Sequence, residues 1–251
     1  MSAVAQAVLL VSFPVAAAAV GSAVAAVRRP GPRLVSGIQH FAAGVVIAAL
    51  AGELLPDLRH EGNLGSAAAG FTAGVALVLS LAAYGRRLDR RQEASQVRST
   101  TANAAATVPI GLLAAVAIDL LIDGVLVGLG TQLGTAQALI LTFALTLEIL
   151  FLSLSLAAEL NDRGLSAPRA ALICTALGLS TAVGAIAAAA FLSGASASVL
   201  AFVLAFGAAA LLYLAVEELL VEAHEQTETA LLSVMFFAGF LTIYVLAELG
   251  R

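Results

Sequence analysis

Three acidic residues lie inside long apolar stretches of this sequence. Asp119 and Asp123 fall in the apolar run 102–130, and Glu148 is near the middle of the next run, 136–160. A spacing of four residues places Asp119 and Asp123 on one face of a helix. Neither run contains Lys or Arg, and a lone charge in such surroundings costs several kcal/mol unless it faces a cavity or a partner. The pattern therefore indicates a cation as the counter-charge.

The composition is that of an integral membrane protein. Hydrophobic residues make up 61% of the chain and charged residues 11%, and the mean hydropathy is +1.03, which lies far outside the soluble range. A spanning helix needs about 20 apolar residues, so the chain has room for eight spans and short loops. We therefore expect one all-α transmembrane domain over residues 1–251, with the lipid bilayer as its surroundings. A single cysteine, Cys174, excludes an internal disulfide.

Apolar runs separated by charges, Gly and Pro predict where the spans lie. The first run is followed by Arg28 and Arg29 and has no basic segment before it, so we interpret it as a span rather than a signal peptide. The segment 86–101 is expected to be a long polar loop that anchors the topology, with contact to anionic lipids as an alternative role. The eight expected spans are 3–27, 34–58, 65–85, 102–130, 136–160, 168–193, 197–222 and 229–249.

Arginine is unevenly distributed among the predicted loops. The positive-inside rule predicts cytoplasmic odd-numbered loops and both termini outside, in a plasma membrane. All basic residues are Arg, which together with the Ala and Gly content suggests a prokaryotic source. The odd-numbered loops hold Arg28, Arg29, Arg33, Arg86, Arg87, Arg90, Arg91, Arg98, Arg163 and Arg169, and the opposite side holds Arg59 and Arg251.

One internal similarity predicts an inverted repeat. The segment 41–57 aligns without a gap on the segment 206–222; both begin with Phe and end in Glu-Leu-Leu, one further residue and an acid. The predicted topology runs the two segments in opposite directions, as in transporters built from opposed repeats. Helices 1–3 would then match helices 6–8 around the central helices 4 and 5. Chance similarity between two Ala- and Leu-rich helices is the alternative.

Asp119, Asp123 and Glu148 are the candidate metal ligands. Converging carboxylates repel one another in a low-dielectric cavity, so an empty site is expected to hold protons that a divalent cation displaces. Oxygen-only ligation favours Mn²⁺, Mg²⁺, Ca²⁺ or Fe²⁺, and Zn²⁺ also accepts carboxylates. The alternative is that the acids stay protonated and hydrogen-bond neighbouring helices as packing contacts.

Further acids and histidines gather at the two ends of the predicted spans. Glu53 and Asp57 could collect cations at an outer entrance. The cytoplasmic group, interpreted as an exit path, consists of His40, Glu217, Glu218, Glu222 and His224. For the glutamates and His224 of the cytoplasmic group, the alternative is an interfacial position wetted by solvent, and for His40 it is a hydrogen-bonded polar residue that binds no ion.

An enzymatic reading is excluded by the arrangement of the two aspartates. Two membrane aspartates suggest intramembrane aspartyl proteolysis, but a dyad that shares a proton needs carboxylates from facing helices. Asp119 and Asp123 stack on one helix, and the sequence has no Ser-His or His-Glu-x-x-His arrangement. We expect no enzyme activity, no organic cofactor and no nucleic-acid partner.

The chain resembles the ZIP (Zrt/Irt-like) family of metal transporters over essentially its whole length. The eight spans are similar to those of the family, and the segment from Phe206 through Tyr213 to Glu225 is similar to its bacterial members. The family's fourth-span signature, His-Asn-x-Pro-Glu-Gly, falls on the segment 119–124, with Asp119 at the His and Asp123 at the Glu. Its fifth-span signature falls on the segment 147–152, with Glu148 at the second position. The resemblance implies metal transport and a homodimer.

The departures from the family pattern are as informative as the matches. Leu120 and Phe151 replace residues that would be ligands of the family's two-metal centre, and Thr181 occupies a position where the sixth span often has Glu. The resemblance therefore leaves a mononuclear, harder site formed by the three acids.

These observations predict a carrier that moves a divalent metal, Zn²⁺, Mn²⁺ or Fe²⁺, toward the cytoplasm. Two alternatives stay open from the sequence. One is a ZIP-fold protein that has lost transport and acts as a structural or regulatory subunit, and the other is a proton-linked carrier of a non-metal solute.

Overall fold

The structure, a computed structural model, describes residues 2–27, 31–60, 63–98, 108–224 and 229–250. Eight helical stretches within these residues are long and apolar enough to cross a membrane, which confirms the all-α membrane fold. The elements are α1 (Ala3–Val27), α2 (Pro32–Ala49), the π-helix η1 (Leu50–Leu54), α3 (Leu55–His60), α4 (Leu64–Arg98), α5 (Ile110–Leu133), α6 (Thr135–Asp162), α7 (Ala167–Phe191), α8 (Ala197–Tyr213), the π-helix η2 (Leu214–Leu219), α9 (Leu220–Ala223) and α10 (Ala230–Gly250).

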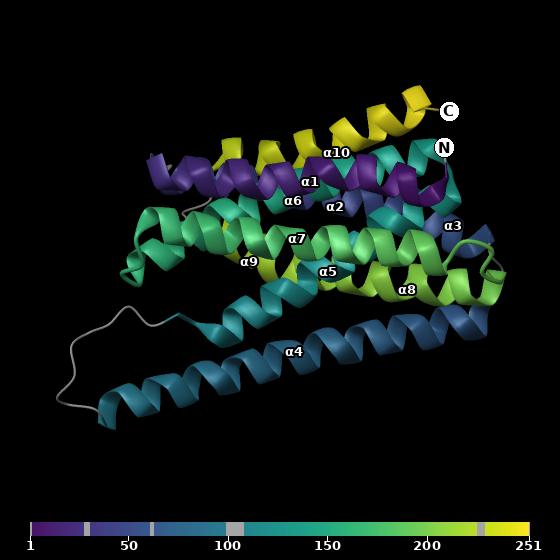
Figure 1. Ribbon diagram of the computed structural model, residues 1–251. Helices are drawn as coiled ribbons and strands as arrows, with labels where there is room; N and C mark the ends of the chain where they lie inside the picture. The colour runs from purple at the N-terminus through teal and green to yellow at the C-terminus, as the bar shows by residue number, and fades with distance from the viewer. Residues whose placement is uncertain (1, 28–30, 61–62, 99–107, 225–228, 251) are drawn as a thin grey trace.

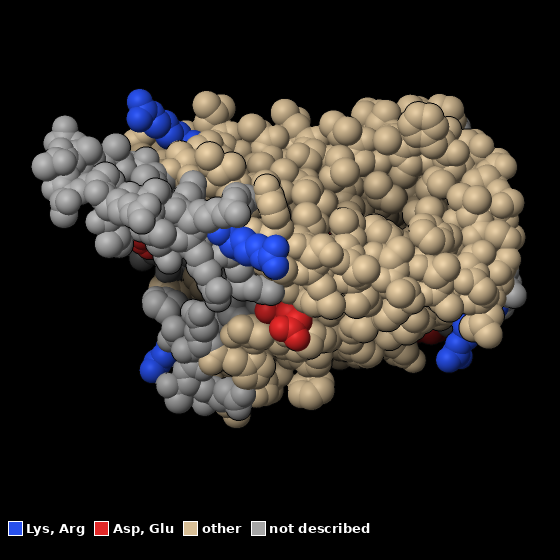
Figure 2. Space-filling model, turned by 90° about the horizontal axis from the view of Figure 1, so that it is seen from below, with Lys and Arg blue, Asp and Glu red and all other residues tan. Residues whose placement is uncertain are grey.

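The long helices run side by side, and both chain termini lie at the same end of the bundle (Figure 1). We call this the terminal end. The opposite end, the arginine end, carries four of the five arginine side chains that the structure describes, Arg33, Arg87, Arg163 and Arg169, whereas Arg59 lies at the terminal end. Figure 2 shows a face that is mostly free of Lys, Arg, Asp and Glu, with the charged side chains in view mainly in its left part and at its right-hand end.

The prediction of a polar loop at 86–101 is wrong for most of its length. α4 continues as one helix through Arg98. The segment 86–98 contains neither Gly nor Pro, and five of its 13 residues are Arg and two are Gln, which are residues of high helix propensity. The charged and polar residues of this segment mark where the membrane-spanning part of α4 stops, but the helix itself continues. Residues 99–101 lie outside the described part of the chain.

The predicted start of the fourth span at residue 102 is also wrong. α5 begins at Ile110, directly after Pro109, and residues 102–107 lie outside the described part of the chain. Proline has no backbone N–H to donate and fixes its own φ, so it is favoured at the very start of a helix and disfavoured further inside. The seven remaining spans agree with the prediction to within a few residues.

Two long helices contain a π-helical stretch at matching positions. α2 continues directly into η1, and α8 continues directly into η2, without a break in the helix. The stretches fall on the two aligned Glu-Leu-Leu segments, so η1 contains Glu53 and η2 contains Glu217. π-turns inside α-helices are frequent at functional sites because they redirect the side chains that follow.

Close helix contacts support the inverted repeat independently. Gly239 of α10 has no room for a Cβ because the carbonyl oxygen of Phe41 on α2 lies against it, and Gly74 of α4 meets the carbonyl oxygen of Phe206 on α8 in the same way. The shift of 165 positions that aligns Phe41 with Phe206 also aligns Gly74 with Gly239. The α2–α10 and α8–α4 crossings are therefore equivalent.

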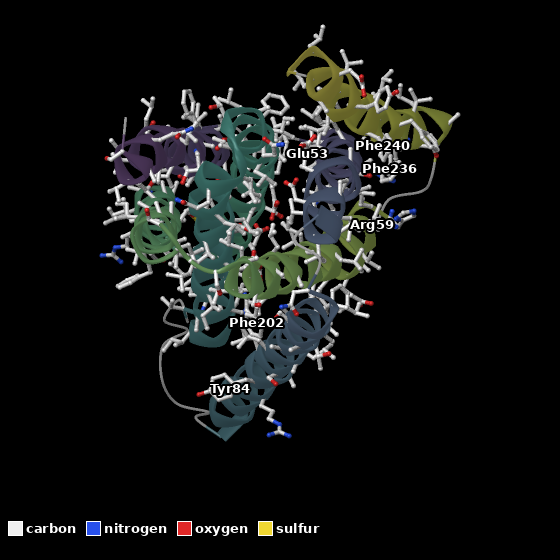
Figure 3. The ribbon with its side chains drawn as sticks, turned by 90° about the vertical axis from the view of Figure 1, so that its right-hand side faces the viewer. Glu53, Arg59, Tyr84, Phe202, Phe236 and Phe240 are labelled. Carbon is white, nitrogen blue, oxygen red and sulfur yellow. The ribbon has the colours of Figure 1, made fainter. Side chains whose placement is uncertain are left out.

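The repeat determines the layout of the bundle. α10 packs on α2 and α4 packs on α8, so α4 and α10 lie at opposite edges (Figure 1). Figure 3 shows Phe236 and Phe240 on α10 beside α2, and Phe202 where α8 passes α4. α1 packs on α6 and α7, and α5 packs on α7, which leaves α5 and α6 in the middle with the acidic residues.

Candidate metal centre

A one-residue turn sets the register between α5 and α6. Gly134 joins the two helices with a φ of 149°, a conformation that residues with a Cβ rarely adopt. Asp119 lies 15 positions before Gly134 and Glu148 lies 14 positions after it. At about 1.5 Å of rise per residue, both side chains start about 21–23 Å from the turn. The hairpin therefore brings Asp119 and Glu148 to the same depth.

The three predicted ligands converge. One carboxylate oxygen from each of Asp119, Asp123 and Glu148 lies within 4.8 Å of the others. Asp123 is 2% exposed and Glu148 is 1% exposed, while Asp119 is half-buried. Three oxygens at this separation surround a space into which one small cation fits, because metal–oxygen distances in proteins are about 2.0–2.6 Å.

The electrostatics of this cluster favour a cation. No Lys, Arg or His occurs between Ile110 and Asp162, so α5 and α6 bring no positive side chain of their own to the centre. Three carboxylates held together away from water repel one another, and the repulsion is relieved either by protons or by a bound cation. The donor set consists of carboxylate oxygens, which suit hard divalent ions.

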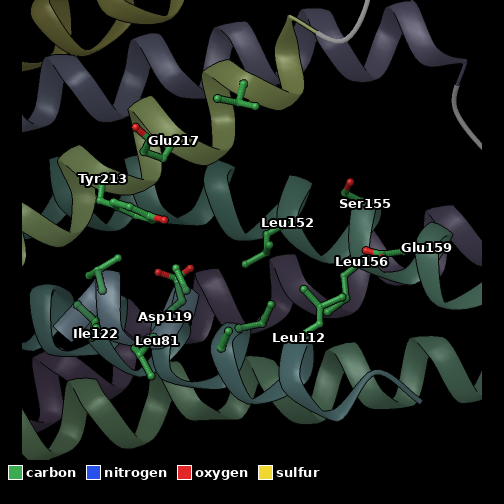
Figure 4. A pocket seen from close by; sticks show the side chains of 15 residues that line it. Leu81, Leu112, Asp119, Ile122, Leu152, Ser155, Leu156, Glu159, Tyr213 and Glu217 are labelled. Atoms are coloured by element: carbon green, nitrogen blue, oxygen red, sulfur yellow. The ribbon is translucent and has the colours of Figure 1, made fainter. Parts of the chain in front are cut away.

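A cavity of about 370 Å³ opens from the centre toward the arginine end. Asp119 is at its inner part, and Glu159 and Val221 line it nearer the arginine end. Figure 4 shows Asp119 and Tyr213 pointing into the same space from opposite walls. α4 closes one side with apolar side chains. The polar lining residues are Asp119, Ser155, Glu159, Tyr213 and Glu217.

Three of these polar residues, Ser155, Glu159 and Tyr213, were not among the predicted site residues. Ser155 and Glu159 follow Glu148 on α6 at spacings of 7 and 11 residues, and both spacings return to the same helix face. This polar stripe along an apolar helix is a signal that the sequence contains. Tyr213 directly precedes η2, and no comparable spacing marks it.

The mouth of the cavity carries an ion pair. Arg163 donates from Nη2 to Glu159 Oε1 at 2.8 Å and from Nε to the same oxygen at 3.1 Å. Both side chains are nearly half exposed, so the pair adds little to stability. The ion pair instead fixes the position of the Glu159 carboxylate, which is at the end of the polar stripe that begins at Glu148.

The predicted exit residues are placed at the arginine end. Glu217 lines the cavity, and the rings of His40 and His224 lie next to each other. Glu218 and Glu222 belong to η2 and α9, but their side chains lie outside the described part of the structure. The structure thus places Glu217 on the same cavity as Asp119 and groups the two histidines separately.

Comparison with known protein families decides the classification of the chain. The family model of the ZIP zinc transporters matches residues 86–247. The chain belongs to the ZIP family. No curated protein matches it significantly. ZIP proteins are membrane transporters of divalent metals, and the matched residues include α5 and α6 with all three acids.

The positions at which this ZIP protein departs from the family signatures have apolar surroundings. Leu120 is 3% exposed and packs in a cluster with Val116 and Ile149. Phe151 is half-buried against the larger apolar core. Both side chains thus contribute to helix packing, and neither can supply an oxygen or nitrogen ligand.

Thr181, at the third departure, is fully buried on α7, and its Oγ1 has no hydrogen-bond partner among the described residues. Its backbone carbonyl lies against Gly124, directly after Asp123. A neutral hydroxyl at this position supplies no carboxylate for a second metal. The three departures together fit one ion at the acidic centre.

The predicted entrance residues of this ZIP protein lie at the terminal end. Glu53 is 7% exposed and lies on the side of η1 that faces the other helices, whereas Arg59 of α3 lies on the outside (Figure 3). Asp57 on α3 is half-buried. The two acids are on the opposite side of the centre from the cavity.

Proposed function

We propose that this ZIP-family protein carries a divalent metal cation toward the cytoplasm, and that Asp119, Asp123 and Glu148 bind the cation at mid-membrane. The observation that carries the proposal is the convergence of three carboxylate oxygens within 4.8 Å. The centre lies on the two helices that the inverted repeat leaves in the middle. Transporters of this architecture bind their substrate at that position.

The donor set supports a mononuclear site for Mn²⁺, Fe²⁺ or Zn²⁺ as the transported substrate. Carboxylates suit all three ions, and the absence of thiolate and imidazole from α5 and α6 removes the usual preference for Zn²⁺. The chemistry needs no organic cofactor.

The path that we propose starts at the terminal end, where Glu53 and Asp57 attract the cation. It continues from the acidic centre through the cavity, past Glu217, to the arginine end. Glu218, Glu222, His40 and His224 are proposed to complete the exit there. The order of these sites along the proposed path follows the positions of the polar residues that face the interior or the cavity.

The charge distribution supports the orientation of this path. Arginine gathers at one end of the bundle, and the positive-inside rule places that end in the cytoplasm. We therefore propose a plasma-membrane protein with both termini outside, forming a single transmembrane domain over residues 1–251. Family membership makes a homodimer a reasonable expectation.

Metal uptake into vesicles tests the proposed function. Purified full-length protein reconstituted into lipid vesicles is expected to take up Mn²⁺, Fe²⁺ or Zn²⁺ with saturation, relative to protein-free vesicles. Absence of uptake for the whole panel, including Co²⁺ and Mg²⁺, would favour a non-transporting subunit. Proton movement that no metal accelerates would favour a proton-linked carrier of another solute.

Cysteine labelling tests the orientation. In a Cys174→Ser background, Leu64→Cys at the terminal end is expected to react with an impermeant thiol reagent in intact cells. Arg87→Cys at the arginine end is expected to react after permeabilisation only. Both positions are exposed, so their difference reports sidedness. Labelling of Arg87→Cys from outside would reverse the proposed direction of transport.

Proton competition tests the carboxylate centre. Carboxylates must be deprotonated to bind a metal, so the apparent metal affinity is expected to weaken as pH falls. Calorimetry at neutral pH in buffers of different ionisation enthalpy counts the protons released per metal ion. The sign is fixed, because a centre that binds protons when empty can only release them on binding. Binding without proton release at any pH would exclude protonated acids from the empty centre.

A further inference from the structure

Two of the three histidines of the chain meet at the arginine end. The ring centroids of His40, on α2, and His224, directly after α9, are 5.1 Å apart, with the ring planes inclined by 48°. His40 is 4% exposed, while His224 is exposed to solvent. The pair therefore joins a buried ring to one that water or a dissolved ion can reach.

The same nitrogen is occupied in both rings. His40 Nδ1 donates to the Ser36 carbonyl oxygen at 2.8 Å, and His224 Nδ1 donates to the Leu220 carbonyl oxygen at 2.5 Å. A carbonyl oxygen only accepts, so Nδ1 carries the proton and Nε2 carries the lone pair of each neutral ring. Metal-binding histidines are oriented in this way, with one ring nitrogen donating to a backbone carbonyl and the other on the metal.

Ser36 couples the positions of the two rings. Its hydroxyl donates to the Ala223 carbonyl oxygen at 2.7 Å, and both residues are buried. Ser36 also supplies the carbonyl that orients His40, and Ala223 directly precedes His224. One buried serine thus fixes His40 on its own helix and ties that helix to the segment bearing His224. Such support limits the motion of two ligands relative to each other.

The separation of the rings suits a shared ion. Two imidazoles on one tetrahedral Zn²⁺, with Zn–N distances of about 2.0–2.1 Å, place their ring centroids about 5 Å apart. We propose that His40 and His224 form a second metal site, through their Nε2 atoms, for borderline divalent ions such as Zn²⁺, Co²⁺, Ni²⁺ and Cu²⁺. Water fills the remaining coordination positions on the exposed side.

The proposal deepens the proposed function and rests on it for the role of the site. Glu217 and Val221 line the cavity, and they precede His224 by about two turns and one turn of helix. An ion that leaves the carboxylates therefore meets nitrogen ligands at the arginine end. Zn²⁺ or Co²⁺ gains more from imidazole than Mn²⁺ does, so this site discriminates among ions that the acidic centre accepts alike.

Copper-binding spectroscopy on the untagged full-length protein tests the site. Cu²⁺ is the probe because its electron paramagnetic resonance spectrum resolves coupling to imidazole nitrogens, which carboxylates do not produce. We expect a bound Cu²⁺ coupled to two nitrogens. His40→Gln or His224→Gln should leave one coupled nitrogen and weaken that binding by more than about tenfold, because removing a ligand costs at least as much as removing its supporting partner.

His60→Gln is the matched control, since it changes the third histidine, at the far end of α3, and should leave both couplings intact. His224→Cys in a Cys174→Ser background, loaded with Co²⁺, should show sulfur-to-cobalt charge transfer, which a packing role for His224 would not produce. Two-nitrogen coupling that survives His40→Gln combined with His224→Gln would overturn the proposal, as would Cu²⁺ bound without nitrogen coupling in the parent.

Repeating the measurement in Asp123→Asn with Glu148→Gln separates this proposal from the proposed function. The histidine signal should persist there, because Asp123 is on α5 and Glu148 is on α6, whereas the histidines are on α2 and directly after α9. Failure of metal uptake in vesicles would leave this result standing, and loss of the nitrogen signal in the parent would leave uptake unaffected. Gel filtration checks that each variant is folded. If His40→Gln does not fold, the Co²⁺ measurement on His224→Cys tests the proposal instead.

Discussion

Asp123→Asn is expected to abolish metal uptake while the protein folds and reaches the membrane. Asparagine has nearly the volume of aspartate, so the packing around a side chain that is 2% exposed is preserved. The substitution removes one of three negative charges from the centre. Uptake should fall by about 100-fold or more, since even the supporting partners of metal ligands cost about 10–100-fold when they are replaced. Initial rates of Mn²⁺, Fe²⁺ and Zn²⁺ uptake in vesicles measure the effect.

Asp162→Asn provides the matched control for this experiment. It makes the same chemical change at an exposed acid at the arginine end of α6, outside the cluster. Its uptake should stay close to that of the parent. Parental uptake of every transported ion by Asp123→Asn would remove this residue from the transport site. Equal losses in both variants would point to the overall charge of the protein instead of the centre.

The acidic centre was predictable because its signal is local. Asp119 and Asp123 share a helix face by their spacing alone, and the next apolar run had to return alongside the first. The depth of Glu148 could not be inferred as easily, since it depends on a turn of one residue at Gly134. A turn two or three residues longer would have shifted Glu148 along α6 relative to the aspartates.

The cavity could not be predicted, because its walls come from distant parts of the chain. α4, α5, α6 and α8 all contribute to it, and their relative positions follow from helix crossings rather than from any one segment. The prediction at 86–101 was wrong for a related reason. Charge composition marks where a helix leaves the membrane, whereas backbone propensity decides where it ends, and α4 continues to Arg98.

The first 85 residues lie outside the region matched by the family model, yet the structure ties them to the matched region. The contacts of Gly74 with Phe206 and of Gly239 with Phe41 relate the two halves by one constant shift in the sequence. η1 and η2 follow the same relation. The sequence indicated this repeat through the Glu-Leu-Leu segments, and the glycine contacts now distinguish it from chance similarity.

Gly124→Ala is expected to separate α5 from α7 and to destabilise the fold strongly. A Cβ at this position would overlap the carbonyl oxygen of Thr181 and come within 2.9 Å of the Ala185 nitrogen. Both are backbone atoms, which cannot turn aside as a flexible side chain would. Overpacking of this kind costs about 1–3 kcal/mol and occasionally more, and we expect the upper end because the clash is with backbone. Thermal unfolding in detergent measures the loss.

Gly65→Ala separates this steric effect from a general effect of adding a methyl group. Gly65 is on α4, and a Cβ there would meet only the Asn63 Oδ1 at 3.8 Å. It should be neutral or stabilising by up to about 1 kcal/mol, because alanine favours the helix over glycine. Gly124→Ala should in addition weaken metal binding, since Asp123 is the preceding residue and moves with α5. Equal stability of the two variants would mean that α5 and α7 do not approach as closely at Gly124 as the structure shows.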